Sequence, residues 1–113
     1  MPGADWQITL ADQTSYVTDP TNPCAGQPFT VSWMEINVGS GPSEAYRDTF
    51  ELNSFSAGWS SQDLDVTDPV QPGDTPWRSL TFTLAAADTY NMNLTIDGVG
   101  MYLGDVIVND CSS

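Results

Sequence analysis

Apolar and polar residues alternate along most of this chain with a period of two. Alternation of this kind is typical of β-strands that bury one face and expose the other to solvent. Pro, Gly, Asn and Asp residues, which favour turns, interrupt the alternation at short intervals. We therefore expect seven short strands, at residues 5–10, 29–33, 46–52, 64–66, 80–84, 90–96 and 106–108.

Seven short strands separated by turn signals are typical of an all-β protein, in particular of a seven-stranded antiparallel immunoglobulin-like β-sandwich. The single helical candidate, residues 84–88, is too short to be stable alone, so we interpret it as a linker. A chain of 113 residues can build one two-layer core without a large internal cavity. We expect one domain that covers residues 1–113.

The charged residues are strongly biased: 15 are acidic and 2, Arg47 and Arg78, are basic, which gives a net charge of −13. We expect no binding to nucleic acid or to anionic membranes, because so acidic a protein can neutralise few phosphates. No apolar window is long enough for membrane insertion. The absence of histidine and lysine excludes histidine-dependent nucleophiles and Schiff-base chemistry. We therefore expect a non-catalytic protein, not an enzyme.

Four segments of the chain resemble one known family. Residues 22–31 (NPCAGQPFTV) resemble the entry to its second strand, and residues 37–41 (NVGSG) resemble its Asn-x-Gly turn. Residues 71–74 (QPGD) and 87–90 (ADTY) resemble later landmarks. The family is that of the CARDB-type domains, cell-adhesion-related bacterial domains with an immunoglobulin-like sandwich. The resemblance implies a surface or adhesion module. Tyr90 also lies where immunoglobulin-like folds carry a tyrosine corner.

The two cysteines, Cys24 and Cys111, both lie in polar, turn-rich surroundings and not in apolar runs. We expect a disulfide between them; the alternative is a pair of free thiols in a reducing compartment. In a sandwich of this topology, the turn after the first strand and the end of the last strand lie at the same pole, which agrees with the pairing. The bond would enclose most of the chain and stabilise the fold by about 4 to 5 kcal/mol.

The expected disulfide favours an extracellular, cell-surface or virion location. The first residues, MPGAD, contain neither the basic region nor the apolar stretch of a signal peptide. Two interpretations stay open at this point. Either a mature secreted fragment was given a starting Met1, or the protein leaves the cell by another route, as a virion component does.

Glu35 is the residue that fits the alternation least, because the pattern directs its carboxylate into the core. The interpretation we favour is a β-bulge at Trp33–Met34, which shifts the alternation so that Met34 and Ile36 face inward. The alternatives are a structural ion pair between Glu35 and Arg47, since a buried carboxylate needs a partner, and a catalytic or ligand-binding role for Glu35.

Asp63, Asp65 and Asp68 form an acidic run around one predicted strand. Three carboxylates gathered at one end of a sandwich have the oxygen ligands that calcium prefers. The alternative is a set of solvated side chains on an outward strand face. Calcium is the one cofactor that the sequence suggests, although the run does not match the EF-hand pattern.

Trp59 and Trp77 both lie in loop-like surroundings. Exposed tryptophans stack on sugar rings or anchor protein interfaces, so both residues are candidates for ligand binding. The alternative is that each covers an open end of the small sandwich.

The leading hypothesis is a non-catalytic extracellular module for adhesion or for assembling a surface structure, with a protein or glycan surface as its partner. The second is a virion or filament decoration protein, which would form a homo-oligomer or a lattice. The third is a carbohydrate-binding domain that uses Trp59 and Trp77.

Overall fold

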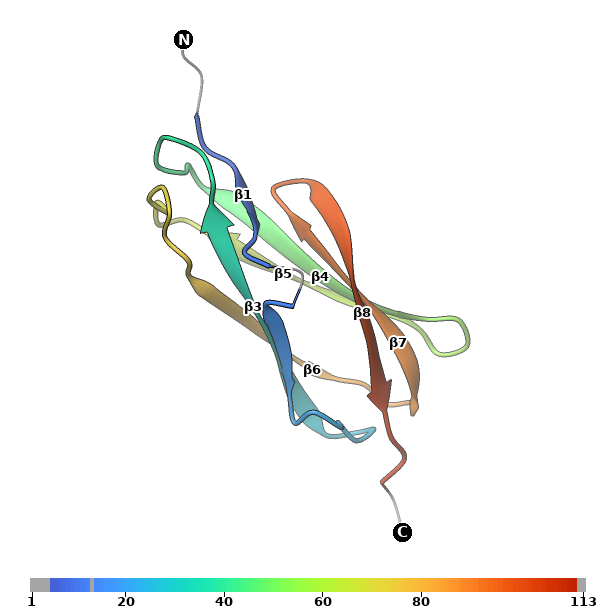
Figure 1. Ribbon diagram of the computed structural model, residues 1–113. Helices are drawn as coiled ribbons and strands as arrows, with labels where there is room; N and C mark the ends of the chain where they lie inside the picture. Colours follow the sequence, from blue (N-terminus) through green and yellow to red (C-terminus); the bar gives the residue numbers. More distant parts are fainter. Residues whose placement is uncertain (1–4, 13, 112–113) are drawn as a thin grey trace.

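The computed structural model describes residues 5–12 and 14–111, whose course is shown in Figure 1. These residues form strands and turns without a helix, so none of them belongs to a helix able to cross a membrane. The strands within the described residues are β1 (Ile8–Leu10), β2 (Tyr16–Asp19), β3 (Pro28–Asn37), β4 (Tyr46–Ser54), β5 (Gly58–Val66), β6 (Trp77–Thr83), β7 (Asp88–Ile96) and β8 (Val99–Val108).

The strands form two four-stranded antiparallel sheets that pack face to face (Figure 1). In the first sheet β3 is central: β6 pairs with its residues 28–34, while β2 and β1 pair with its residues 30–33 and 35–37. Because β2 and β6 pair with the same residues of β3, they lie on opposite sides of it. The second sheet has the order β5-β4-β7-β8. The antiparallel β-sandwich expected from the sequence is confirmed.

The described residues form eight strands, one more than expected. The unexpected strand is β2, in which Tyr16 is only half-buried and Val17 is 50% exposed, so no apolar alternation marks it. In addition, β8 begins at Val99 and not at residue 106. Its exposed residue Tyr102 is apolar, and Leu103 is an extra residue in the pairing with β7, so the period of two is lost.

Four buried aromatic rings join the two sheets at the centre of the core. Trp33 of the first sheet stacks on Phe50 of the second, with 5.4 Å between ring centroids. Phe82 lies 5.9 Å from Phe50 and 6.2 Å from Phe29. Each such pair contributes about 0.5 to 1.5 kcal/mol beyond the burial of its surface. The alternation that predicts strands at 29–33, 46–52 and 80–84 therefore also identifies the core.

The connection between β6 and β7 is fixed by Tyr90. Its hydroxyl donates a hydrogen bond to the carbonyl of Ala86, at 2.7 Å. This is the tyrosine corner expected from the position of Tyr90 at the start of a strand. Ala85 and Ala86 form a bend and not a helical turn, as expected for a linker.

The pole at which β8 ends is closed by the two cysteines. Cys24 and Cys111 form a disulfide with 5.5 Å between their Cα atoms. Main-chain hydrogen bonds lie beside it: Asn109 donates to the carbonyl of Pro23, and Ala25 donates to that of Asn109, both at 2.8 Å. The pairing expected from the sequence is present, at the pole where the topology predicts it.

The opposite pole depends on the turn after β3. The side-chain oxygen of Asn37 accepts from the main-chain N–H groups of Gln7 and Gly39, at 3.2 and 2.9 Å, and its amide donates to the carbonyl of Val70 at 2.8 Å. A Cβ atom on Gly39 would lie 2.2 Å from the carbonyl oxygen of Asp5. Only glycine, which has no Cβ atom, lets the segment before β1 pass this closely. This explains why glycine follows Asn37 and Val38 in the turn.

Candidate functional site

Buried residues alternate along β3 without interruption as far as Glu35 and Asn37, which expose 0% and 1% of their surface. The β-bulge expected at Trp33–Met34 is therefore wrong: β3 pairs with β6 residue by residue from Pro28 to Met34. Met34 is half-buried on the outer face of the sheet and not in the core. Glu35 points inward because donors in the core compensate its charge.

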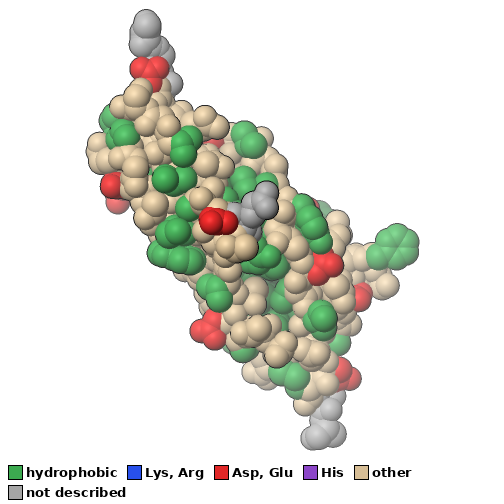
Figure 2. All heavy atoms as spheres, in the orientation of Figure 1, with side chains coloured by type: hydrophobic (Ala, Val, Ile, Leu, Met, Phe, Trp, Pro, Cys, Tyr) green, Lys and Arg blue, Asp and Glu red, His purple; other side chains and the backbone are tan. Residues whose placement is uncertain are grey.

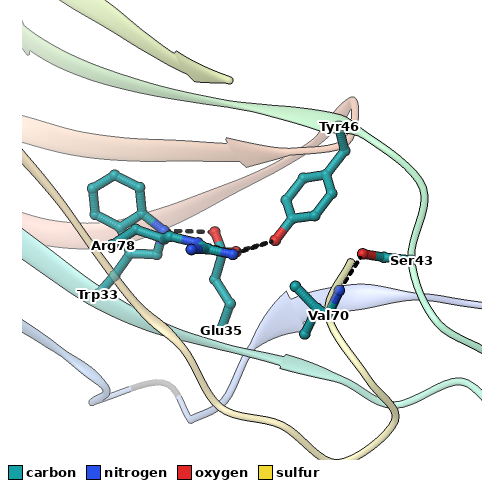
Figure 3. A network of polar contacts seen from close by, with 6 residues as sticks. All are labelled: Trp33, Glu35, Ser43, Tyr46, Val70 and Arg78. Atoms are coloured by element: carbon teal, nitrogen blue, oxygen red, sulfur yellow. Dashed lines mark hydrogen bonds and ion pairs between the residues drawn. The ribbon is translucent and has the colours of Figure 1, made fainter. Parts of the chain in front are cut away.

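Three side chains from both sheets contact the Glu35 carboxylate (Figure 3). The hydroxyl of Tyr46 donates to Oε1 at 2.6 Å, and Trp33 Nε1 donates to Oε2 at 2.7 Å. Arg78 forms an ion pair with Oε1 through Nε, at 3.3 Å, and its Nη2 donates to the Tyr46 hydroxyl at 3.3 Å. The alternative partner Arg47 is wrong, because that side chain is exposed outside the second sheet.

A second carboxyl group, that of Asp48, lies beside Glu35 and is also fully buried. As an anion it lacks a hydrogen-bond donor for either oxygen within the described part of the chain. Burial, followed by the neighbouring Glu35 carboxylate, raises the pKa of Asp48 to about 9. At neutral pH Asp48 therefore keeps its proton, and its hydroxyl can donate to Glu35. We call Trp33, Glu35, Tyr46, Asp48 and Arg78 the buried ionic centre.

The buried ionic centre is almost closed to solvent. Arg78 is its most exposed member, with 20% of its side chain accessible beside a hollow of about 360 Å³ that Asp68, Val70 and Pro76 help to line. A catalytic carboxylate has to contact its substrate, and Glu35 exposes no surface with which to do so. The centre connects β3 and β6 to β4, and so it ties one sheet to the other.

Two of the three aspartates proposed as calcium ligands, Asp63 and Asp65, lie beside Arg47. Arg47 donates to Asp65 through Nε at 2.7 Å and lies 3.8 Å from Asp63, which also accepts from the Thr49 hydroxyl at 2.8 Å. Asp68 follows β5 in a loop. Within residues 5–12 and 14–111, no three acidic, cysteine or histidine side chains are grouped as metal ligands. The structure therefore does not bring the three aspartates together, and calcium binding stays an untested prediction.

Trp59 and Trp77 are both exposed, by 68% and 55%, and their role in ligand binding stays an untested prediction. The loop-like surroundings expected for them are wrong, because both lie in strands. They lie on different sheets, however: Trp59 belongs to β5 and Trp77 to β6. In each strand the neighbouring residues point inward, so the two rings face outward from opposite sides of the sandwich. One small ligand cannot contact both.

The outer face of the second sheet places Trp59 at the end of a polar row. Trp59 pairs with Asn53, Asn53 with Asn91, and Asn91 with Asp105. The next row contains Ser61, Glu51, Asn93 and Tyr102. We call the side chains of these two rows the Trp59 face.

Tyr102 is the second aromatic ring of the Trp59 face, at the edge opposite Trp59, and it is 61% exposed. Its hydroxyl donates to Asp105 at 2.6 Å, which raises the pKa of Tyr102. Tyr102 lies outside the strand predicted at residues 106–108, and so the alternation did not identify it as a candidate. The alternation predicts that Asn91 and Asn93 point to solvent. It does not predict that they lie beside Trp59, because that depends on the order of the strands in the sheet.

The β4–β5 hairpin next to Trp59 projects from the body of the molecule. Figure 2 shows hydrophobic atoms at the tip of this projection, where Phe55 is fully exposed. Ser54 supports the turn: its hydroxyl accepts from the N–H groups of Ser56 and Ala57, at 3.2 and 2.9 Å, and donates to Asp88 at 2.5 Å. The bond to Ser54 lowers the pKa of Asp88.

No protein-family model matches this sequence, and no curated protein matches it. Among solved structures, the chain is similar to the CARDB domain of the PF1109 protein from Pyrococcus furiosus, solved in complex with di-metal ions. That likeness has 13% sequence identity and a TM-score of 0.65, and it covers 96% of this chain and 97% of the other. A putative ApaA protein from Bordetella pertussis is 10% identical with a TM-score of 0.53, over 99% of this chain and 100% of the other. At such identities the likeness concerns the fold, and this chain has the sandwich fold of a CARDB domain.

Proposed function

We propose that this protein is a non-catalytic extracellular module of the adhesion type, and that it binds a neutral glycan with the Trp59 face. The observation that carries the proposal is the composition of this face: exposed aromatic rings at two opposite edges, with amide, hydroxyl and two carboxylate groups between them. The CARDB-like fold supports an adhesion-type role. The disulfide supports an oxidising, extracellular environment.

The chemistry of the Trp59 face suits a polyhydroxylated, uncharged ligand. Aromatic rings such as those of Trp59 and Tyr102 offer flat apolar surfaces. The side chains of Asn53, Asn91 and Asn93 both donate and accept hydrogen bonds, which matches hydroxyl groups. Strands spaced about 4.8 Å apart separate the two outer strands of the sheet by about 14 Å, enough for a short oligosaccharide. The carboxylates on the face repel anionic glycans.

The test is a screen of neutral and anionic glycans, followed by calorimetric titration of the neutral glycan that binds best. We expect Trp59→Ala to weaken binding by about tenfold or more, and Asn91→Ala to weaken it by a smaller factor. The matched control is Trp77→Ala, which removes the same ring from the opposite face and leaves the affinity unchanged.

Two results would contradict the proposal. Binding that survives Trp59→Ala but is lost in Trp77→Ala would place the site on the other sheet. Binding of anionic glycans alone, or of no glycan, would exclude the proposed ligand class.

The outer face of the first sheet supports a second candidate function, protein contact in a surface assembly. Val17 and Trp77 are 50% and 55% exposed there, and Ser32 and Ser79 lie between them. These four residues are uncharged, although Arg78 also borders the surface, and an exposed tryptophan beside small polar side chains suits a protein interface. Sedimentation over a range of concentrations tests it: self-association abolished by Trp77→Glu but not by Trp59→Glu would favour assembly.

A further inference from the structure

β8 is an edge strand of unusual length. It runs for ten residues, Val99–Val108, at the end of the second sheet, whereas an average strand has about five or six. It pairs with β7 on one side. On the other side, no strand of the described chain pairs with it. Natural proteins usually keep such edges short or protect them with charge, because the open row of N–H and C=O groups can pair with another chain.

Directly after β8 ends, one residue of the chain already pairs on this open side. Cys24 and Asn109 form a parallel bridge, with main-chain bonds from Asn109 to Pro23 and from Ala25 to Asn109. Main-chain groups of every second residue point to the same side of a strand. Those of Asp105 therefore point to the same side as those of Asn109, but no neighbouring strand of the described chain continues the pairing.

Two hollows follow the seam between β8 and the first sheet. One, of about 480 Å³, is lined by the apolar residues Leu10, Met101 and Leu103 and also by polar residues such as Thr9 and Asp12. The other, of about 350 Å³, lies between β2 and the lower half of β8. Tyr16 lies between them: its hydroxyl is so close to Gly104 that a Cβ there would be 2.9 Å away. The open edge is thus flanked by space for side chains.

The side chains of β8 give the edge little electrostatic protection. Val99, Tyr102 and Ile107 are exposed by 64%, 61% and 58%, and Asp105 is the only charged residue of the strand. In Figure 2, hydrophobic side chains lie along β8 and its seam with the first sheet. The extra residue at Leu103 bends the strand but does not cover the edge.

We propose that the open edge of β8 binds an extended peptide segment of a partner protein, which joins the second sheet as an added strand. Main-chain hydrogen bonds would hold the segment, and its alternate apolar side chains would enter the hollows. Charge indicates the partner: two copies of a protein of net charge −13 repel each other, while Asp12 and Asp105 at the groove attract lysine or arginine. We therefore expect a partner segment in which every second residue is apolar and in which lysine or arginine lies at each end. The groove shares Tyr102 and Asp105 of β8 with the Trp59 face, but Trp59 itself lies on the opposite edge strand, so the variant Trp59→Ala distinguishes the two sites.

The probe is a synthetic peptide of alternating valine and threonine, about seven residues long, with lysine at each end. The control peptide carries proline in place of the central valine, because proline has no N–H to donate and disrupts a strand. Binding to the full chain is measured by calorimetry, and amide exchange is followed by NMR. We expect slower exchange of the Asp105 and Ile107 amides and an affinity at least about tenfold weaker for the proline peptide.

The variant Ile107→Pro, which removes the N–H from the same edge, should also abolish binding, and Trp59→Ala should leave it unchanged. The peptide comparison decides the matter even where Ile107→Pro fails to fold. The proposal is overturned by equal binding of both peptides, by no binding, or by protection of β5 amides instead. Protection of β8 amides by self-association, without peptide, would overturn the choice of partner.

Discussion

The buried Asp48 carboxyl group lies beside the Glu35 carboxylate, and a second negative charge there is unfavourable. Its pKa is raised to about 9 by burial and by Glu35, whereas an unfolded chain has an Asp pKa of about 3.9. Below about pH 4 the Asp48 carboxyl group is protonated in both the folded and the unfolded protein, so it does not make the free energy of unfolding depend on pH. Between about 4 and 9 only the folded state binds it, so the free energy of unfolding falls as the pH rises. At neutral pH, Asp48 therefore lowers stability.

We predict that Asp48→Asn stabilises the protein, and more so as the pH rises. Asparagine keeps the shape and a donor for Glu35 but does not titrate. The difference in unfolding free energy between variant and wild type should grow between pH 5 and pH 8, by at most about 1.4 kcal/mol per pH unit. Denaturant unfolding at both pH values, followed by tryptophan fluorescence, measures it.

The control is Asp68→Asn, which makes the same change in an exposed loop. It should shift the unfolding free energy by a small amount at either pH. A constant difference between Asp48→Asn and wild type would show that the carboxyl group is ionised in the folded protein.

At the scale of elements, the short strands β1 and β2 are the weakest part of the sandwich. They have three and four residues, and both pair with β3 alone. The contact of Asn37 with Gln7 and the close passage of Asp5 over Gly39 hold the chain before β1 in place. Docking of the first strand thus depends on a turn from a different strand.

We predict that Gly39→Ala loosens β1 before it affects the rest of the fold. The added Cβ would lie 2.2 Å from the Asp5 carbonyl oxygen, so the segment has to move away. The expected loss is about 1 to 3 kcal/mol in unfolding free energy. Hydrogen exchange should become faster at the amides of Thr9 and Ala11, which face β3, than at β7. In the control Gly41→Ala, the nearest atom is 3.9 Å away, so exchange should stay as in wild type. Uniformly faster exchange would contradict this view of β1.

Period-two alternation was sufficient to predict the sandwich, its aromatic core and the tyrosine corner, since each depends on residues near one another in sequence. It did not identify the partner of Glu35. Arg47 is closer in the chain, but Arg78 faces Glu35 because β6 pairs with β3. The same holds for the Trp59 face, where Asn53, Asn91 and Trp59 become neighbours only through strand order. Residue type and local pattern contain no information about that order.

At the scale of the whole molecule, three kinds of contact join the sheets: the aromatic cluster, the buried ionic centre and the disulfide pole. The first two lie inside the sandwich and tie β3 and β6 to β4. The disulfide lies outside it and ties the turn between β2 and β3 to the end of the chain after β8. Figure 1 shows β1 near one end of the molecule and the disulfide pole near the other.

This arrangement determines which strands carry tension when the two ends of the chain are pulled apart. The force passes from β1 and β2 to Cys24 and crosses directly to Cys111, so β3 to β8 are bypassed. We predict a short extension in single-molecule stretching of the oxidised protein, from β1, β2 and their flanking residues. After reduction, the 87-residue separation of the cysteines should add about 300 Å of contour length. Equal extensions in both states would contradict this path. The Trp59 face would therefore stay intact under mechanical load, because its four strands belong to the part of the chain that tension does not reach. The hollows beside β8 would open, because β1 and β2 supply one of their walls.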